Sequence, residues 1–194
     1  MFSRFFKRFS DLVIISRSHD IARRYVVVNG FDGALTTLGL LVGFYISTGT
    51  NINIAITACL SAAIALAMSG LSSAYVSEAA ERKREFREIQ SAMISDLSGS
   101  VHAKASIWMP LLIAITNGLS PLILSLIIIT PLLLTQFGYS LPFNPYEAGI
   151  GIAFFLIFLL GVFLGRVGGT FWLVSGLQTL LVALITTVLI YLIT

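Results

Sequence analysis

The stretch GALTTLGLLVGF, residues 33–44, decides the fold of this chain. It contains no charged residue and belongs to a longer apolar run, so it predicts a membrane-spanning helix. Asp32 stands immediately before it. A carboxylate at the centre of a span costs about 2.5–3.5 kcal/mol on insertion scales, and such a group usually marks a site for a cation or a proton.

Composition agrees with a membrane protein. Of the 194 residues, 57% are apolar and only 11% are charged, and the mean hydropathy is +0.94. Soluble domains carry about twice that charged fraction, so we expect an all-α integral membrane protein with the bilayer as its solvent. Cys59 is the single cysteine, which excludes an internal disulfide and a cysteine-based zinc site.

Five apolar segments predict five transmembrane helices. The third is long and contains Asn117, Pro121 and Pro131, which predicts one tilted, kinked helix with an extended end, or alternatively two half-helices in a re-entrant hairpin. An amphipathic interfacial helix and a short charged helix complete the fold. The predicted parts are the interfacial helix 1–24, spans 1 and 2 within 25–76, the charged cytoplasmic segment 77–104, and spans 3 to 5 within 105–194.

The basic residues form three clusters, each before or between predicted spans. Such clusters mark the cytoplasmic side of a membrane protein and do not indicate nucleic-acid binding. With five spans, all three clusters lie on the side of the N-terminus, which places the N-terminus in the cytoplasm and the C-terminus outside. No organelle signal is visible, which favours a prokaryotic plasma membrane.

The spacing around Asp32 predicts one helical stripe that also carries Thr36, Gly39 and Gly43. Gly39 and Gly43 form a small-xxx-small pair, which allows two helices to approach closely. At a two-fold interface, two copies of Asp32 would meet and could share a divalent cation. The alternative is that Asp32 only caps the N-terminus of the first span.

Neutral oxygens near the predicted spans could line a polar pathway. Ser72 and Ser73 lie at the end of the second span, and Asn117 lies in the third. The same side chains suit hydrogen bonds between helices equally well.

An acidic stripe follows the second span. Its members are separated by three, four and three residues, which places them on one helix face: Glu78, Glu81, Glu85 and Glu88. Oxygen-rich faces bind divalent cations. The alternative is a solvated helix, in which Arg82 pairs with Glu78 and Arg84 pairs with Glu88 at i,i+4 spacing.

Residues 29–37, NGFDGALTT, followed by Gly39 and Gly43, resemble the first-span signature of the vacuolar iron transporter family. The order of parts is similar as well: a basic N-terminal helix, two spans, a Glu-rich segment and three spans. The closing stretch 164–192 resembles the last span of that family. The resemblance covers about residues 20–194.

Two positions of the second span depart from the family pattern. Aligned on Tyr75, this chain has Gly70 where the family usually has Met, and Ala74 where it usually has Glu. The Glu-rich segment is also shorter than the metal-binding domain of the family.

The resemblance implies a homodimer that exports Fe²⁺, and often Mn²⁺, from the cytosol in exchange for protons, through a pathway at the two-fold interface. It implies that Asp32 binds the metal and that the acidic stripe corresponds to the start of the cytoplasmic metal-binding region. The metal is then the transported substrate, and no permanent cofactor is expected.

These observations predict a divalent-cation transporter and not an enzyme. Asp32 would carry metal or proton, and Thr36, Ser72, Ser73 and Asn117 would supply neutral oxygens. One alternative is a non-transporting scaffold, which the departures at Gly70 and Ala74 favour. A less favoured alternative is an intramembrane aspartyl protease. Such an enzyme needs two facing aspartates, and no other predicted span contains an aspartate, so only a dimer could supply the second one.

Overall fold

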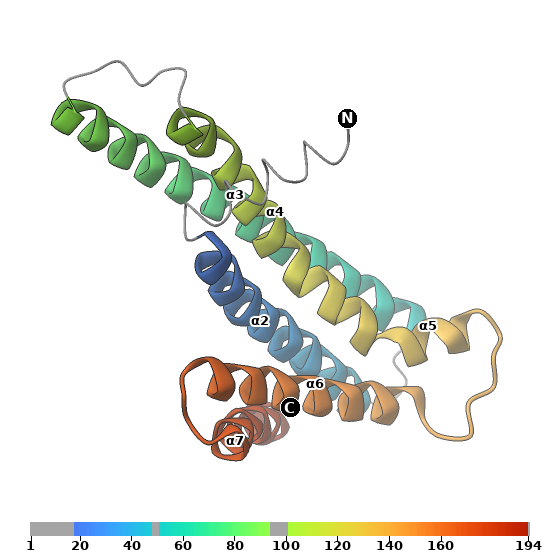
Figure 1. The fold of residues 1–194 in the computed structure, drawn as a ribbon. Helices are drawn as coiled ribbons and strands as arrows, with labels where there is room; N and C mark the ends of the chain where they lie inside the picture. The colour runs from blue at the N-terminus through green and yellow to red at the C-terminus, as the bar shows by residue number, and fades with distance from the viewer. Residues whose placement is uncertain (1–17, 48–50, 94–100, 194) are drawn as a thin grey trace. The chain divides into compact units, whose positions relative to one another are not determined.

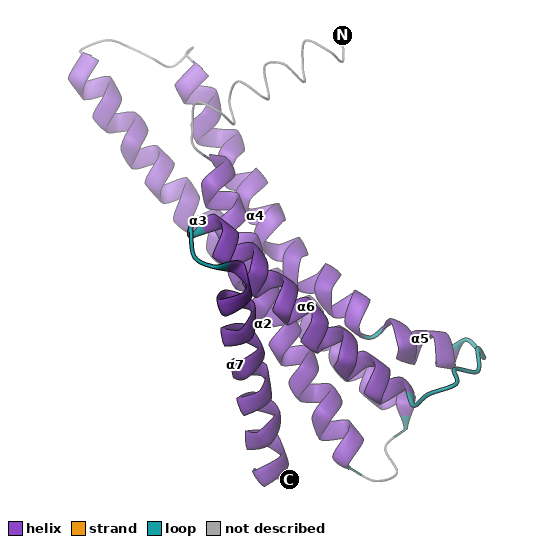
Figure 2. Ribbon diagram, turned by 60° about the horizontal axis from the view of Figure 1, so that its bottom comes forward, coloured by secondary structure: helices purple, strands orange, loops and turns teal. Residues whose placement is uncertain are grey.

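The computed structural model describes residues 18–47, 51–93 and 101–193, and the regular structure within those ranges is entirely helical (Figure 2). Five of the helices are long and apolar enough to cross a membrane, which confirms the predicted all-α membrane fold. The predicted interfacial helix lies mostly outside the described residues. In chain order the helices are α2 Ser18–Ile46, α3 Ile52–Met93, α4 Val101–Ile128, α5 Thr130–Gln136, α6 Pro145–Val167 and α7 Trp172–Ile193 (Figure 1).

Helix α3 is much longer than a single span requires. Its 42 residues correspond to about 63 Å, roughly twice the hydrocarbon thickness of a bilayer. The apolar part agrees with the predicted second span, and the charged segment continues the same helix as far as Met93. Residues 71–93 contain neither Gly nor Pro, so nothing in the sequence ends the helix between the apolar and charged parts.

The third span is one helix, α4, extended by the short helix α5. Asn117 and Pro121 lie inside α4 without ending it. The break falls at Ile129 because Pro131 has no N–H to donate and is favoured in the first turn of a new helix. The helical hydrogen-bond pattern continues as far as the break, since the Ile129 N–H donates to the Ser125 carbonyl at 3.0 Å. In both views α5 leads away from the end of α4 and does not turn back as a hairpin (Figures 1 and 2).

The chain divides into two compact units. Among the described residues, the first unit contains 18–26, 68–93 and 101–119, and the second contains 27–47, 51–67 and 120–193. The second unit holds the larger apolar core. Fully buried side chains reach this core from three of its helices: Leu38 and Leu41 of α2, Ile128 of α4 and Ile157 of α6.

Helices α6 and α7 pack closely through small residues. We call this contact, which includes Gly161, Gly165, Ser175 and Thr179, the α6–α7 seam. A Cβ atom on Gly165 of α6 would lie 2.7 Å from Ser175 Oγ of α7, and one on Gly161 would overlap Thr179. A Cβ on Gly176 of α7 would in turn lie 2.5 Å from the ring of Phe158. The helices can therefore approach this closely only because these positions are glycine.

Candidate functional site

Asp32 lies well inside helix α2 and is exposed. Fourteen helical residues, 18–31, precede it, so about 21 Å of helix lies between its position and the start of α2. Side-chain capping serves only the first turn of a helix. The alternative that Asp32 caps the first span is therefore wrong, and the carboxylate has no local backbone role that would explain it.

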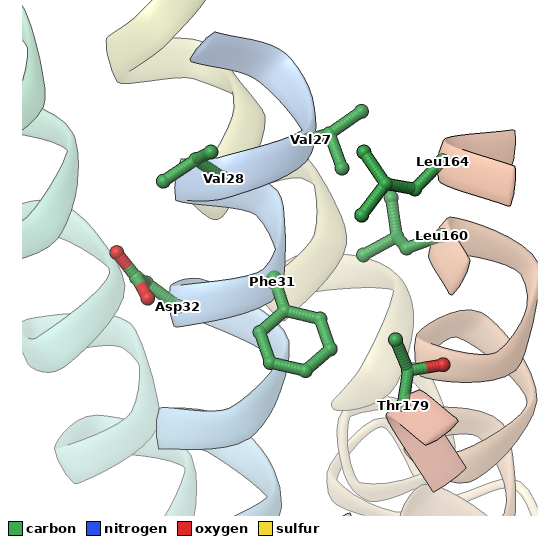
Figure 3. A pocket seen from close by; sticks show the side chains of 7 residues that line it. All are labelled: Val27, Val28, Phe31, Asp32, Leu160, Leu164 and Thr179. Atoms are coloured by element: carbon green, nitrogen blue, oxygen red, sulfur yellow. The ribbon is translucent and has the colours of Figure 1, made fainter. Parts of the chain in front are cut away.

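A cavity of about 260 Å³ lies beside Asp32 in the second unit (Figure 3). Its walls come from α2, α6 and α7 and are almost entirely apolar. Among the described residues that line it, Asp32 is the only charged one, and its carboxylate points away from the leucines of α6. The lining residues are Val27, Val28, Phe31, Asp32, Leu160, Leu164 and Thr179.

The exposed face of α2 continues on both sides of Asp32. Val28, one turn before it, is 52% exposed, and Thr36, one turn after it, is also exposed. The opposite face carries Ala34 and Leu38, which are fully buried. Within the part of the chain that the structure describes, neither an ion pair nor a hydrogen bond satisfies the Asp32 carboxylate. Asp32 and Thr36 therefore share one exposed face, as their spacing predicts.

The two glycines predicted to pack at a dimer contact behave differently from each other. A Cβ on Gly39 would lie 3.2 Å from Ile190 Cδ1 of α7, so Gly39 faces a helix of its own chain. A Cβ on Gly43 would meet no atom within 4 Å. Of this pair, only Gly43 is open on the surface of the chain.

Close packing of α2 depends instead on two glycines on either side of Asp32. A Cβ on Gly33 would lie 2.6 Å from the Cα of Pro121 in α4, and one on Gly30 would lie 2.8 Å from Ser120 Oγ. The backbone of α4 at Pro121 is a rigid obstacle, so Gly33 is required there. The sequence shows both glycines around Asp32, but helical spacing alone does not reveal which helix they face.

A buried polar pair also lies on this side of α2. The hydroxyls of Thr37 and Ser125 are 2.8 Å apart, and Thr37 Oγ1 lies at the same distance from the Gly33 carbonyl oxygen. Both side chains are at most 2% exposed. Sequence reasoning missed this pair, because nothing distinguishes Ser125 from other hydroxyl residues in an apolar segment.

The remaining predicted pathway residues belong to the first unit, whereas Asp32 and Thr36 belong to the second. Ser72 and Ser73 are exposed on α3, and their hydroxyls donate to carbonyls of the same helix. Asn117 of α4 is 2% exposed, and its Nδ2 donates to the Gly70 carbonyl at 2.8 Å. Asn117 therefore joins α4 to α3 at one of the positions that depart from the family pattern.

Gly70, Ala74 and Glu78 follow one another at intervals of four residues, and all three are buried. Glu78 is 4% exposed, and Arg82 Nε lies 3.9 Å from its carboxylate. Glu78 lies beyond the apolar part of α3. Burial raises the pKa of its carboxyl above the ordinary value, and the charge of Arg82 opposes that shift.

Three members of the acidic stripe, Glu78, Glu85 and Glu88, form ion pairs with arginines of the same helix. Arg82 Nη1 donates to Glu85 at 3.1 Å, and Arg84 Nε donates to Glu88 at 2.8 Å. Both predicted i,i+4 pairs, Glu78 with Arg82 and Arg84 with Glu88, are therefore present. Across residues 18–47, 51–93 and 101–193, no three His, Cys, Asp or Glu side chains gather into a group able to hold a metal ion.

Comparison with known proteins finds a relative of similar length. The chain is 28% identical over 173 residues to the uncharacterized protein MJ0645 of the archaeon Methanocaldococcus jannaschii, a match that covers 88% of this chain and 87% of that protein. The two proteins are thus similar over nearly their whole lengths. No protein-family model matches the chain, and no solved structure matches it.

Proposed function

We propose that this protein is a membrane transporter that moves a divalent metal ion, Fe²⁺ or Mn²⁺, out of the cytosol in exchange for protons. The observation that carries the proposal is Asp32. It is an exposed carboxylate inside a membrane-spanning helix, and no cationic side chain among the described residues neutralises it. A carboxylate at such a position is costly to keep, and binding of a cation or a proton removes that cost.

The chemistry of exchange follows from the carboxylate itself. A metal ion and a proton compete for the same oxygen lone pairs, so binding of one releases the other. Oxygen ligands suit Mn²⁺ well and accept Fe²⁺. The Thr36 hydroxyl, one turn along the same exposed face, supplies a neutral oxygen next to Asp32.

The remaining predicted residues would act before the ion reaches Asp32. Glu81, Glu85 and Glu88 are exposed on the charged part of α3, where they would raise the local concentration of cations. Ser72, Ser73 and Asn117 would offer neutral oxygens to the ion within the first unit. We expect the N-terminus and these glutamates on the cytoplasmic side of a plasma membrane.

The resemblance to the iron transporters supports a homodimer. The pathway proposed here follows the exposed face of Asp32 and Thr36, and it does not require Gly39 to meet a second copy, since Ile190 of the same chain already packs against that glycine.

Flux measurements in proteoliposomes test the proposal. Metal entry and lumenal pH are followed with separate dyes for the wild type, Asp32→Asn and Glu147→Gln. Glu147 is the matched control, because it is an exposed carboxylate at the start of α6 that accepts a hydrogen bond from Tyr45 at 2.7 Å, away from the cavity. We expect metal flux with opposing proton flux in the wild type and the control, and a loss of at least about tenfold in Asp32→Asn.

Each contrary result has a definite meaning. Flux that survives in Asp32→Asn would remove Asp32 from the mechanism and direct attention to Glu81, Glu85 and Glu88. Absence of Fe²⁺ and Mn²⁺ flux in wild-type protein with an intact thermal transition would overturn the proposal and favour a non-transporting scaffold.

A further inference from the structure

Helix α7 has two opposite faces of different character. The inner face packs against α6 and α2 through small or partly buried residues, including Gly176, Ala183 and Ile190. The rest of the helix is largely exposed, and only 11% of its most apolar segment is buried, the smallest share among the five spans.

The outer face of α7 has a regular repeat, which we call the outer seam. Its members are separated by four, three, four, three and four residues, the spacing of the a and d positions of a heptad. Every one of them is exposed. The outer seam consists of Val174, Gln178, Leu181, Ile185, Val188 and Leu192.

The apolar members alone would not indicate a protein partner, because lipid covers such residues equally well. Gln178 is the residue that indicates a protein partner rather than lipid. It lies six residues inside a span of otherwise mostly apolar side chains, it is exposed, and its amide has no hydrogen bond to any described residue. A side-chain amide left without a partner in hydrocarbon is unfavourable by several kcal/mol on transfer scales.

A primary amide is complementary to a second copy of itself, since it offers both a carbonyl acceptor and N–H donors. Two copies of one membrane protein insert in the same orientation, so their α7 helices run parallel and equal residues meet at equal depth. A single polar residue in a heptad repeat fixes the register of such a helix pair.

We propose that α7 forms a parallel interface with α7 of a second copy of this chain, in which the heptad residues of the outer seam interdigitate and each Gln178 amide hydrogen-bonds to the other. The interface gives a homodimer contact on α7 rather than on the α2 glycines. It does not depend on metal transport, and its test does not use transport as a readout.

Disulfide trapping locates the interface. Leu181→Cys and Ile185→Cys introduce thiols into the outer seam, and Leu184→Cys is the matched control, since Leu184 is 57% exposed on the flank of the same helix. The native Cys59 is fully buried and remains in place. We expect oxidation of full-length protein in dilute proteoliposomes to give covalent dimers at 181 and 185 but not at 184. Equal trapping at all three positions, or none at any, would overturn the proposal.

Substitution of the amide tests its role. Gln178→Leu should raise the dimer dissociation constant in lipid by roughly tenfold, as measured by single-molecule photobleaching. Thr186→Val is the control, because the Thr186 hydroxyl donates to the Val182 carbonyl of its own helix. It should leave the dimer unchanged. A Gln178→Leu protein that dimerises as tightly as the wild type would exclude the amide pair.

Discussion

Thr37 of α2 and Ser125 of α4 share a hydrogen bond of 2.8 Å in the buried interior of the second unit. Both hydroxyls also lie near the Gly33 carbonyl, at 2.8 Å and 3.4 Å. A hydroxyl has one proton, so Thr37 donates either to Ser125 or to the Gly33 carbonyl at any one time. When Thr37 donates to Ser125, the Ser125 hydroxyl donates to the Gly33 carbonyl. The contact between α2 and α4 beside Asp32 is therefore held by polar groups as well as by close packing.

Removing this bond should weaken the fold by a measurable amount. Thr37→Val keeps the shape of the side chain and loses the hydroxyl, and Ser125→Ala removes the other partner. In a double-mutant cycle measured by reversible unfolding in mixed micelles, we expect a coupling free energy of about 0.6 kcal/mol and at most about 1.7 kcal/mol, the average and the largest values found for hydrogen bonds between membrane helices. Purely additive effects would show that the two hydroxyls do not interact.

Glycine substitutions should separate the packed part of α2 from its open part. Gly33→Ala would place a methyl group 2.6 Å from the Cα of Pro121, so α2 and α4 must move apart, and we expect a loss of about 2 kcal/mol or more. Gly43→Ala meets nothing within 4 Å and should be neutral or slightly stabilising, because alanine favours a helix over glycine. Unfolding free energies of the two variants, compared with the wild type, check this. Equal effects would contradict the packing described here.

Substitution of Arg82 should lower the free energy of unfolding more than substitution of Arg84. The Arg82 guanidinium lies near the buried Glu78, whereas Arg84 pairs with Glu88 on the surface, where both side chains are more than 60% exposed. Arg82→Gln removes from a buried carboxylate the cation that acts on it most strongly, so we expect a loss of about 1–3 kcal/mol, against less than about 0.5 kcal/mol for Arg84→Gln. Adding Glu78→Gln should restore part of the loss in Arg82→Gln.

The loss in Arg82→Gln should also depend on pH. Burial raises the pKa of Glu78 above its ordinary value of 4.5. At pH values between the pKa of the unfolded state and that of the folded state, the folded protein therefore holds a proton that the unfolded protein has released. Stability contributed by this group is therefore complete below pH 4.5 and falls as the pH rises through the higher pKa of the folded protein. Thermal unfolding from pH 4 to pH 8 measures this slope, and a loss independent of pH would exclude Glu78 as its source.

The number and order of the spans could be predicted because runs of about 20 apolar residues have few other stable states. The break before Pro131 follows from proline chemistry, but Pro121 and Asn117 lie within an unbroken α4. Proline is tolerated inside a membrane helix when neighbouring groups compensate for it, and here α2 packs closely against that position. Such compensation depends on tertiary contacts, which a linear sequence does not display.

The candidate site was predictable only in part for a related reason. Helical periodicity correctly places Asp32 and Thr36 on one face, because that requires only the geometry of a single helix. It cannot identify the helix that meets a glycine. Gly39 packs against Ile190 in its own chain, and the closest approach of α2 is at Gly33.

The α6–α7 seam has a consequence for how the protein assembles in a membrane. The two helices are joined by residues 168–171 alone, a turn in which Gly169 adopts a positive φ of 69°. Gly161, Gly165, Ser175 and Thr179 of the seam all belong to these two helices, so no other segment is needed to complete it. Membrane helices insert first and associate afterwards. The pair can consequently dock as a finished hairpin, and α2 then has a preformed surface to bind.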